Sequence, residues 1–202
     1  DCEGPGTDKS KGTCIADADP LTTTDPLSKD TDTGGSSDGS EDWNLDGKVD
    51  TGEGNPANAG DDDQVIDTDG DGLGDKLETE TLDTQAMDAD SDDDGLFDGL
   101  EPNPACDTDG DGLVNVLDVD SDDDALFDGL EAGKDCGNPD TDASKKHCHF
   151  DGDPSTKTSV LLRDTDHGGV IDGSEDANIN GVLGVLETNP NFGDDDVSVV
   201  DT

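Results

Sequence analysis

The sequence predicts a mostly irregular fold, an extended array of repeated acidic loops with little helix or strand. Three observations lead to this prediction. The chain of 202 residues has a formal net charge of −46, and only 27% of its residues are hydrophobic and 2% aromatic. A short acidic phrase recurs along the chain, and a longer unit recurs at a spacing of 134 residues. Such a composition is typical of a chain that cannot fold by apolar burial alone.

The acidic phrase is clearest between Asp107 and Glu131, where two loops stand head to tail. Oxygen-bearing residues occupy positions 1, 3, 5 and 12 of each loop, and a small residue occupies position 6. This is the spacing of a calcium loop, because Ca²⁺ takes six to eight oxygen ligands at about 2.3–2.6 Å and the small residue permits the sharp turn. Position 7 offers its carbonyl, and a glutamate at position 12 can bind through both oxygens.

The phrase occurs eight times, and the loops start at Asp30, Asp42, Asp67, Asp90, Asp107, Asp120, Asp164 and Asp176. The loops at Asp67 and Asp90 match the template at every side-chain position. In other loops glycine replaces the fifth-position acid, alanine replaces the turn glycine, or asparagine replaces aspartate, at Gly34, Gly168, Ala125, Asn178 and Asn180. A solvated acidic tail would explain the charge but not this spacing.

The predicted calcium ligands are the oxygen-bearing side chains at positions 1, 3, 5, 9 and 12 of these loops. They are Asp30, Asp32, Asp38, Glu41, Asp42, Asn44, Asp46, Asp50, Glu53, Asp67, Asp69, Asp71, Asp75, Glu78, Asp90, Asp92, Asp94, Asp98, Glu101, Asp107, Asp109, Asp111, Asn115, Asp118, Asp120, Asp122, Asp124, Asp128, Glu131, Asp164, Asp166, Asp172, Glu175, Asp176, Asn178, Asn180 and Glu187.

The longer repeat appears when the two ends of the chain are compared. Residues 30–42 reappear as residues 164–176, and the preceding connector reappears with its cysteines at the same spacing. Self-similarity at a fixed period is typical of repeat arrays. We therefore expect about one and a half copies of a 134-residue unit, and the sequence reads as a mature product or an excerpt.

The repeats divide the chain into five segments. These are a cysteine-bearing connector (1–29), tandem calcium loops (30–66), four further loops (67–134), a second copy of the connector (135–163) and a second copy of the tandem loops (164–202). We expect one short helix between Asp75 and Leu82 and one short strand at residues 160–162.

Apolar residues recur at positions 7, 8 and 11 of two loops. They are Leu96, Phe97, Leu100, Leu126, Phe127 and Leu130, and we expect them to pack neighbouring loops together. Trp43 is expected to be a local packing residue, because its counterpart in the second copy is Ala177.

The five cysteines indicate an oxidising, extracellular location. Cys2 with Cys14 and Cys136 with Cys148 share one spacing, which favours two local disulfides. Cys106 is left over, either free or paired with a segment outside this sequence.

A metal site at Cys136, His147, Cys148 and His149 is the alternative to the second disulfide. The first copy of the connector lacks both histidines, which argues against that site. No apolar run approaches the roughly 20 residues of a membrane span, and the basic residues are too few to bind nucleic acid.

The sequence resembles the thrombospondin type 3 repeat, especially its bacterial versions. The motifs that carry the resemblance are DTDGDGLGDKLE from Asp67, DADSDDDGLFDGLE from Asp88 and DTDGDGLVNVLDVDSDDDALFDGLE from Asp107. The match is specific over residues 67–131, looser in the tandem loops on either side, and absent from the connectors. Animal members carry about one cysteine per repeat, whereas these loops have almost none, so no disulfide pattern is carried over.

The resemblance implies an extended chain wound around a string of calcium ions, with carboxylates shared between adjacent ions. The loops at Asp107 and Asp120, joined through Asp118, are placed for such sharing. Further acids stand beside the loops, at Asp61, Asp62, Asp63, Asp88, Asp194, Asp195 and Asp196. We therefore expect more than eight calcium ions. Dockerin modules use similar loops, but each leads into a helix, whereas glycine, aspartate or proline follows most loops here.

Two classes of function are expected. The first is a rigid stalk or fibre in a secreted or cell-surface protein, with neighbouring copies of the same repeat or chain as partners. The second is a calcium-dependent adhesion module that binds a cell-surface or matrix partner; calcium buffering is a weaker third. The acid pairs are spaced as metal ligands, and no nucleophile and base recur together, so we do not expect an enzyme.

Overall fold

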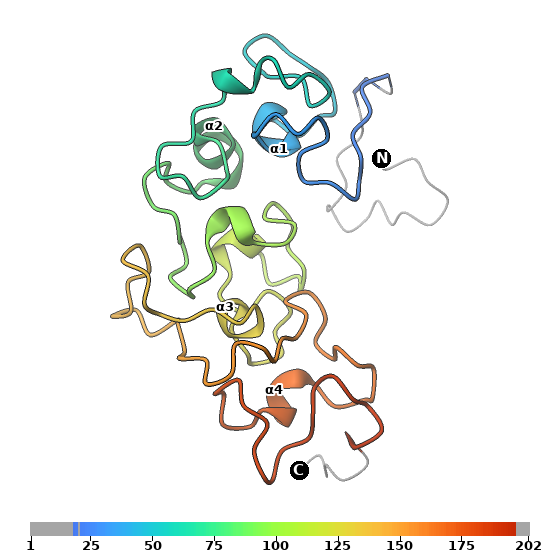
Figure 1. Ribbon diagram of the computed structural model, residues 1–202, viewed down its shortest axis with the longest axis vertical. Helices are drawn as coiled ribbons and strands as arrows, with labels where there is room; N and C mark the ends of the chain where they lie inside the picture. Colours follow the sequence, from blue (N-terminus) through green and yellow to red (C-terminus); the bar gives the residue numbers. More distant parts are fainter. Residues whose placement is uncertain (1–17, 20, 197–202) are drawn as a thin grey trace. The chain divides into compact units, whose positions relative to one another are not determined.

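The computed structural model describes residues 18–19 and 21–196, so the predicted Cys2–Cys14 disulfide lies outside the described residues. Within that range the chain is mostly irregular, with short helical segments and no strand (Figure 1). This confirms the prediction of a mostly irregular fold with little helix or strand. The chain divides into two compact units, Asp1–Ala89 and Asp90–Thr202, and the division falls inside the segment 67–134.

Most helical segments occupy the end of an acidic loop. They start at loop position 9 and stop at position 11 or 12, and the residue before each one has extended backbone geometry. These segments are α1 (Asp38–Glu41), α2 (Asp75–Leu77), η4 (Asp98–Leu100), η5 (Asn115–Leu117), α3 (Asp128–Glu131) and α4 (Asp172–Glu175). A single helical turn therefore aims the position-12 side chain back towards its own loop.

Two helical segments lie outside this pattern. The π-helix η3 (Glu78–Leu82) continues α2, which confirms the helix predicted between Asp75 and Leu82. It ends at Asp83, whose left-handed backbone (φ 62°) stops the helix. The 3-10 turn η2 (Asp62–Gln64) lies between the loops that start at Asp42 and Asp67.

The strand predicted at residues 160–162 is wrong. Val160 is buried, at 7% exposure, but it lies in a turn in which the Leu162 N–H donates to the Ser159 carbonyl at 2.8 Å. A strand needs a neighbouring strand for its backbone groups, and the described residues offer none. Of the three apolar residues only Val160 is buried, while Leu162 is 47% exposed, so the apolar run does not indicate a strand.

Carboxylates outnumber apolar side chains in the buried part of the described chain. Nine hydrophobic side chains are buried, against 20 Asp and Glu side chains. The buried hydrophobic residues are Leu73, Leu77, Leu82, Ala89, Leu96, Val116, Leu126, Leu130 and Val160. Leu96, Leu126 and Leu130 are each 3% exposed, as expected of packing residues. Leu100 does not meet this expectation: its side chain is 51% exposed, and its segment η4 is wound as a 3-10 turn whereas Leu130 lies in an α-helical turn.

Loops in the second unit pack through glycine at position 10. The Gly129 N–H of α3 donates to the Asp94 carboxylate, and the Gly173 N–H of α4 donates to Asp124 Oδ2 at 3.3 Å. A Cβ added to Gly129 would lie 2.3 Å from the carbonyl oxygen of Asp94, and one added to Gly173 would lie 2.3 Å from that of Asp124. Position 10 must therefore lack a side chain where one loop rests on the fifth position of another.

We expect Gly129→Ala to destabilise the folded chain by about 3 kcal/mol, because the new methyl group meets rigid backbone. Gly39 is the matched control, since it holds position 10 of the first loop and its Cβ would meet only Leu45 at 3.5 Å and Leu77 at 3.8 Å. Gly39→Ala should be neutral or slightly stabilising in calcium-containing buffer. Equal thermal unfolding midpoints for the two variants would contradict the packing described here.

Candidate metal centres

All eight acidic loops have the same backbone reversals. Positions 4 and 6 have positive φ in every loop, including those with an imperfect sequence. At position 4 the residues are Thr33, Leu45, Gly70, Asp93, Gly110, Asp123, His167 and Ile179; at position 6 they are Gly35, Gly47, Gly72, Gly95, Gly112, Ala125, Gly169 and Gly181. Ala125 adopts the left-handed backbone at φ 80°, so the alanine found there does not change the turn.

These reversals bring the side chains at positions 1, 3 and 5 together, as the spacing predicts. In the loop at Asp67, carboxylate oxygens of Asp67, Asp69 and Asp71 all lie within 4.8 Å of one another. The same holds for the corresponding trios of the loops at Asp90 and Asp107. Such groups of acids could each hold a metal ion.

Backbone amides fix the orientation of the converging carboxylates. Asp67 accepts the N–H groups of Gly70 at 2.7 Å and Gly72 at 3.2 Å, which are positions 4 and 6. Asp71 at position 5 accepts the N–H of Leu73 at 2.7 Å. Because each carboxylate oxygen has two lone pairs, these bonds orient the side chains and leave acceptor capacity facing the centre of the loop.

The position-9 side chains accept two hydrogen bonds from position 2 of the same loop, a contact between positions 2 and 9 that we call the brace and did not predict from the sequence. Both oxygens of Asp75 accept from Thr68 at position 2, one from its N–H at 2.8 Å and one from its hydroxyl at 2.7 Å. Six loops contain this brace, through the pairs Thr31–Asp38, Thr68–Asp75, Ser91–Asp98, Thr108–Asn115, Ser121–Asp128 and Thr165–Asp172. The sequence feature that could have predicted these hydrogen bonds is the serine or threonine that recurs at position 2 of the six loops. A metal contact for position 9 stays a prediction.

The loops at Asp42 and Asp176 are built differently. They lack a hydroxyl at position 2, and the position-12 carboxylate accepts the N–H of position 9 instead. Glu53 accepts from the N–H of Asp50 at 2.7 Å, and Glu187 accepts from the N–H of Gly184 at 2.7 Å. Both glutamates remain partly exposed, so the position-12 acid is less buried in these two loops than in the other six.

Trp43 has the local role that the sequence suggests. Its ring lies 5.6 Å from Lys76 Nζ, and its carbonyl accepts from the Thr81 hydroxyl. These contacts join the loop at Asp42 to position 10 of the loop at Asp67 and to η3, which follows that loop.

The position-12 glutamates of the other loops are deeply buried. Glu41, Glu78 and Glu175 are 0% exposed, Glu131 is 2% exposed and Glu101 is 6% exposed. In the described part of the chain, neither carboxylate oxygen of Glu41 or Glu101 has a hydrogen-bond partner, and the same is true of Asp122 at position 3. Buried ionised carboxylates without partners are costly, so these groups must either take up a proton or be balanced by positive charge.

Burial is the main cause of raised pKa values at these acids, and neighbouring carboxylates add to it. The pKa of Glu101 is raised to about 12, that of Asp92 to about 10, and those of Glu41, Asp122 and Asp128 to about 8. Each shift means that the site disfavours negative charge in the absence of a cation. A bound divalent ion would reverse this preference.

Asp118 stands where two consecutive loops meet. It is 8% exposed, and its Oδ1 accepts the N–H of Asp120 at 3.2 Å. Burial raises its pKa to about 6, and the charges of Asp111 and Asp109 act in the same direction. The residue therefore lies at the end of one predicted site and the start of the next, while ligand sharing itself stays a prediction.

The second predicted disulfide is confirmed, because Cys136 and Cys148 are bonded to each other. The bond removes both thiolates from the alternative site with His147 and His149. His147 Nδ1 instead lies 2.6 Å from the Asp92 carbonyl oxygen, and the His149 ring packs edge-on against Phe127. Cys106 is a free, partly buried thiol whose pKa is raised by burial.

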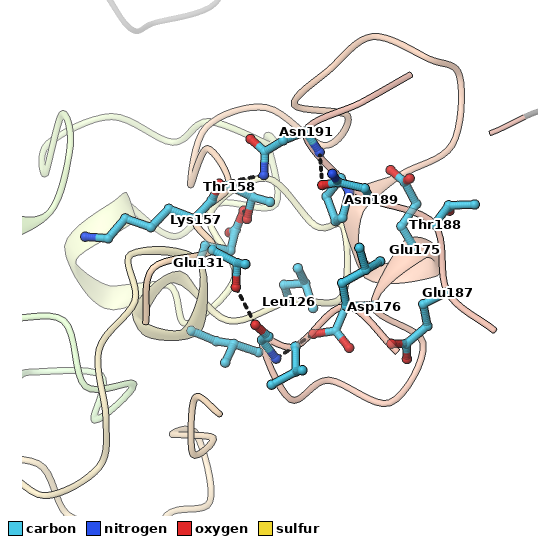
Figure 2. Close-up of a pocket in the computed structure, with 16 residues that line it drawn as sticks. Leu126, Glu131, Lys157, Thr158, Glu175, Asp176, Glu187, Thr188, Asn189 and Asn191 are labelled. Atoms are coloured by element: carbon cyan, nitrogen blue, oxygen red, sulfur yellow. Dashed lines mark hydrogen bonds between the residues drawn. The ribbon is translucent and has the colours of Figure 1, made fainter. Parts of the chain in front are cut away.

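A small cavity of about 50 Å³ lies in the second unit (Figure 2). Leu126, Leu130 and Glu131 line it together with residues of the loop at Asp176 and of the segment 156–158. The volume suits a few water molecules and is below the roughly 300–1,000 Å³ of a typical small-molecule site.

No protein-family model matches the chain, and no curated protein matches it. Among residues 18–19 and 21–196, none of the helices has the length and apolar character needed to cross a bilayer.

Proposed function

We propose that this chain is a calcium-binding structural repeat region that stiffens a stalk or fibre of a secreted or cell-surface protein. The observation that carries the proposal is the burial of carboxylates at the ends of loops whose other carboxylates converge on one point. Glu41 and Glu101 are the clearest examples, since both oxygens of each lack partners among the described residues.

Basic side chains cannot supply the compensating charge. The chain has 56 Asp and Glu against 10 Lys and Arg. Ion pairs such as Lys145–Asp93 at 3.0 Å and Arg163–Asp123 at 3.7 Å use basic side chains that are more than half exposed. Cations from solution are therefore the agents that fit the buried acids.

Calcium suits the donor set better than other common metals. The clustered ligands are oxygens, whereas zinc favours nitrogen and sulfur donors. Magnesium demands near-ideal octahedral geometry and keeps several waters, while calcium accepts more numerous ligands in flexible arrangements. The resemblance to thrombospondin type 3 repeats points the same way, and we retain the expectation of more than eight ions.

The small apolar core explains why bound calcium would stiffen the chain. Each unit has few buried hydrophobic side chains, so its loops are held together by the ions that their carboxylates share. A chain ordered in this way is rigid when calcium is bound and unfolds, losing its stiffness, when calcium is removed.

The test is calorimetric titration of the metal-free chain with Ca²⁺ and, separately, with Mg²⁺. More than eight bound calcium ions, with much weaker magnesium binding, are expected. Fewer than six calcium ions, or equal preference for the two metals, would count against the proposal.

The loops should differ in affinity according to their carboxylate count. Asp71→Ala removes an acid from a fully matched loop, while Asn180→Ala removes a neutral ligand at the same position of the loop at Asp176. We expect Asp71→Ala to lower the unfolding midpoint in calcium more than Asn180→Ala does. Differential scanning calorimetry measures both, and the opposite order would refute the ranking.

An adhesion module is the second candidate, favoured by apolar exposure in the loop at Asp176. Val185 and Leu186 are almost fully exposed, at 101% and 99%, beside Leu183 at 53%. On this alternative, replacing Val185 and Leu186 by serine would abolish binding to a cell-surface or matrix partner and leave the calcium count unchanged.

A further inference from the structure

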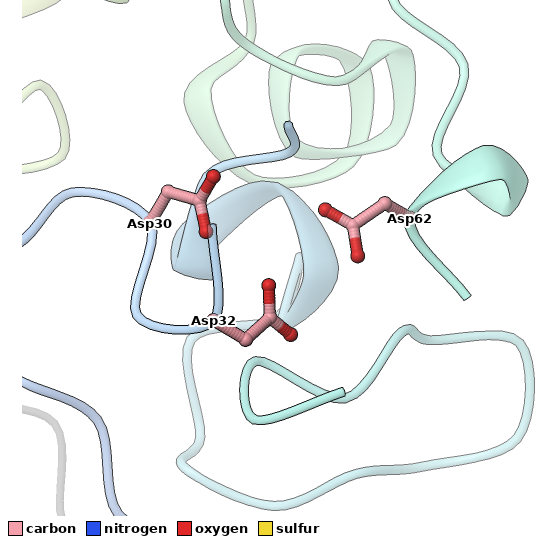
Figure 3. A group of neighbouring side chains, drawn as sticks. All are labelled: Asp30, Asp32 and Asp62. Atoms are coloured by element: carbon pink, nitrogen blue, oxygen red, sulfur yellow. The ribbon is translucent and has the colours of Figure 1, made fainter. Parts of the chain in front are cut away.

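Two loops have no side chain at position 5, where Gly34 and Gly168 stand. In the loop at Asp30, the vacant place is filled from elsewhere in the chain. A Cβ added to Gly34 would lie 2.3 Å from the carboxylate carbon and both carboxylate oxygens of Asp62. Asp62 belongs to η2, outside the eight predicted loops, and its side chain points towards Asp30 and Asp32 (Figure 3).

Asp62 also reproduces the hydrogen bond of a fifth-position acid. Its Oδ2 accepts the N–H of Ser36, which is position 7 of the loop, at 2.8 Å. In the loop at Asp67, Asp71 accepts the position-7 N–H of Leu73 at 2.7 Å in the same way. Asp62 therefore takes the place and the backbone partner that a side chain at Gly34 would have.

The acids around Asp62 are arranged for a cation. Oxygens of Asp30, Asp32 and Asp62 lie within 4.8 Å of one another, and so do those of Glu41, Asp61 and Asp62. Asp62 is 7% exposed and its Oδ1 has no hydrogen-bond partner in the described chain. Glu41 is 0% exposed, and both of its oxygens likewise lack partners among the described residues.

The second unit repeats this construction with different residues. A Cβ added to Gly168 would lie 2.0 Å from Asp196 Oδ2 and 2.6 Å from Asp196 Cγ. Asp196 is 5% exposed, and the position-12 acid of that loop, Glu175, is 0% exposed. Two independent loops with glycine at position 5 thus each receive a carboxylate from a later segment.

We propose that Asp62 is a ligand of the divalent cation bound by the loop at Asp30, together with Asp30, Asp32 and Glu41, and that Asp196 has the same role in the loop at Asp164. This inference rests on the proposed calcium binding. The ion links η2 to the loop at Asp30, so the segment between them is held at both ends. The glycine at position 5 is then a requirement of the site, because a side chain there would collide with the incoming carboxylate.

The test compares Asp62→Ala with Asp63→Ala by calorimetric titration of each metal-free chain with Ca²⁺. Asp63 is the matched control, since it is the adjacent acid in η2, is exposed, and takes part in neither the group Asp30–Asp32–Asp62 nor the group Glu41–Asp61–Asp62. Asp62→Ala should bind at least one ion fewer than the unaltered chain, while Asp63→Ala should keep the full number. Unchanged stoichiometry and affinities in Asp62→Ala would overturn the composite site, whereas an unaltered chain that binds no calcium would overturn the proposed function itself.

Moving the carboxylate gives a second, independent readout. The double variant Gly34→Asp with Asp62→Ala places an acid at position 5 of the loop itself and removes the incoming one. Recovery of the lost ion in the double variant would support the assignment and show that Asp62→Ala had not simply unfolded the chain. A double variant that stays at the stoichiometry of Asp62→Ala would contradict it.

Discussion

Replacing Glu101 by glutamine is expected to change stability in opposite directions with and without calcium. In excess calcium the variant loses a charged position-12 ligand. At a free calcium concentration a thousand times the dissociation constant, loss of one site would remove about 4 kcal/mol of stabilisation. Without calcium the variant should be more stable than the unaltered chain at neutral pH. Burial raises the pKa of Glu101 to about 12, so the folded metal-free chain must take up a proton there, whereas glutamine is neutral in both the folded and the unfolded chain.

Chemical unfolding in calcium and in chelator measures both effects of Glu101→Gln. Glu80→Gln is the control, because Glu80 is an exposed acid outside the predicted ligand set and its neutralisation should matter little in either condition. Destabilisation of Glu101→Gln by the same amount in both conditions would indicate a packing role for Glu101 and would contradict its assignment as a metal ligand.

The metal-free chain should be more ordered in acid than at neutral or higher pH. The pKa values of Glu41, Asp122 and Asp128 are raised to about 8, above the roughly 4 of unfolded carboxyl groups. The folded metal-free chain therefore binds more protons than the unfolded chain. The stability that protonation of these three groups contributes is fully present below about pH 4 and is lost as the pH rises through about 8.

Calcium should reverse this pH dependence, because the ion binds the ionised carboxylates and competes with protons. Circular dichroism of the metal-free chain from pH 4 to pH 9 should show a loss of ordered signal, and calcium titrations over the same range should show affinity increasing with pH. Order in the metal-free chain that increases with pH would contradict the electrostatic account.

The sequence was sufficient to locate the loops because their key residues are tied to fixed positions. Carboxylates at positions 1, 3 and 5 and a small residue at position 6 follow from the turn that an ion requires. The helix after Asp75 was also predictable, since it continues the turn of its loop. The mostly irregular backbone of residues 18–19 and 21–196 followed from composition.

Other features depend on the three-dimensional arrangement and left little signal in the sequence. A glycine at position 5 reads as a defective loop, and nothing local to Gly34 identifies Asp62 as the replacement. The brace between positions 2 and 9 could have been found, because a hydroxyl residue recurs with the aspartate. The apolar residues 160–162 were misread as a strand, since a short apolar run does not by itself distinguish a strand from a turn with one buried residue, here Val160.

The central claim is that calcium holds this chain in its folded form, and small-angle X-ray scattering at neutral pH with and without chelator tests it most directly. With calcium bound, a compact or rigid particle with a well-defined profile is expected. Chelation should increase the radius of gyration towards the roughly 48 Å expected of an unfolded chain of this length, and added calcium should reverse the change. A scattering profile that is identical with and without chelator would contradict the account.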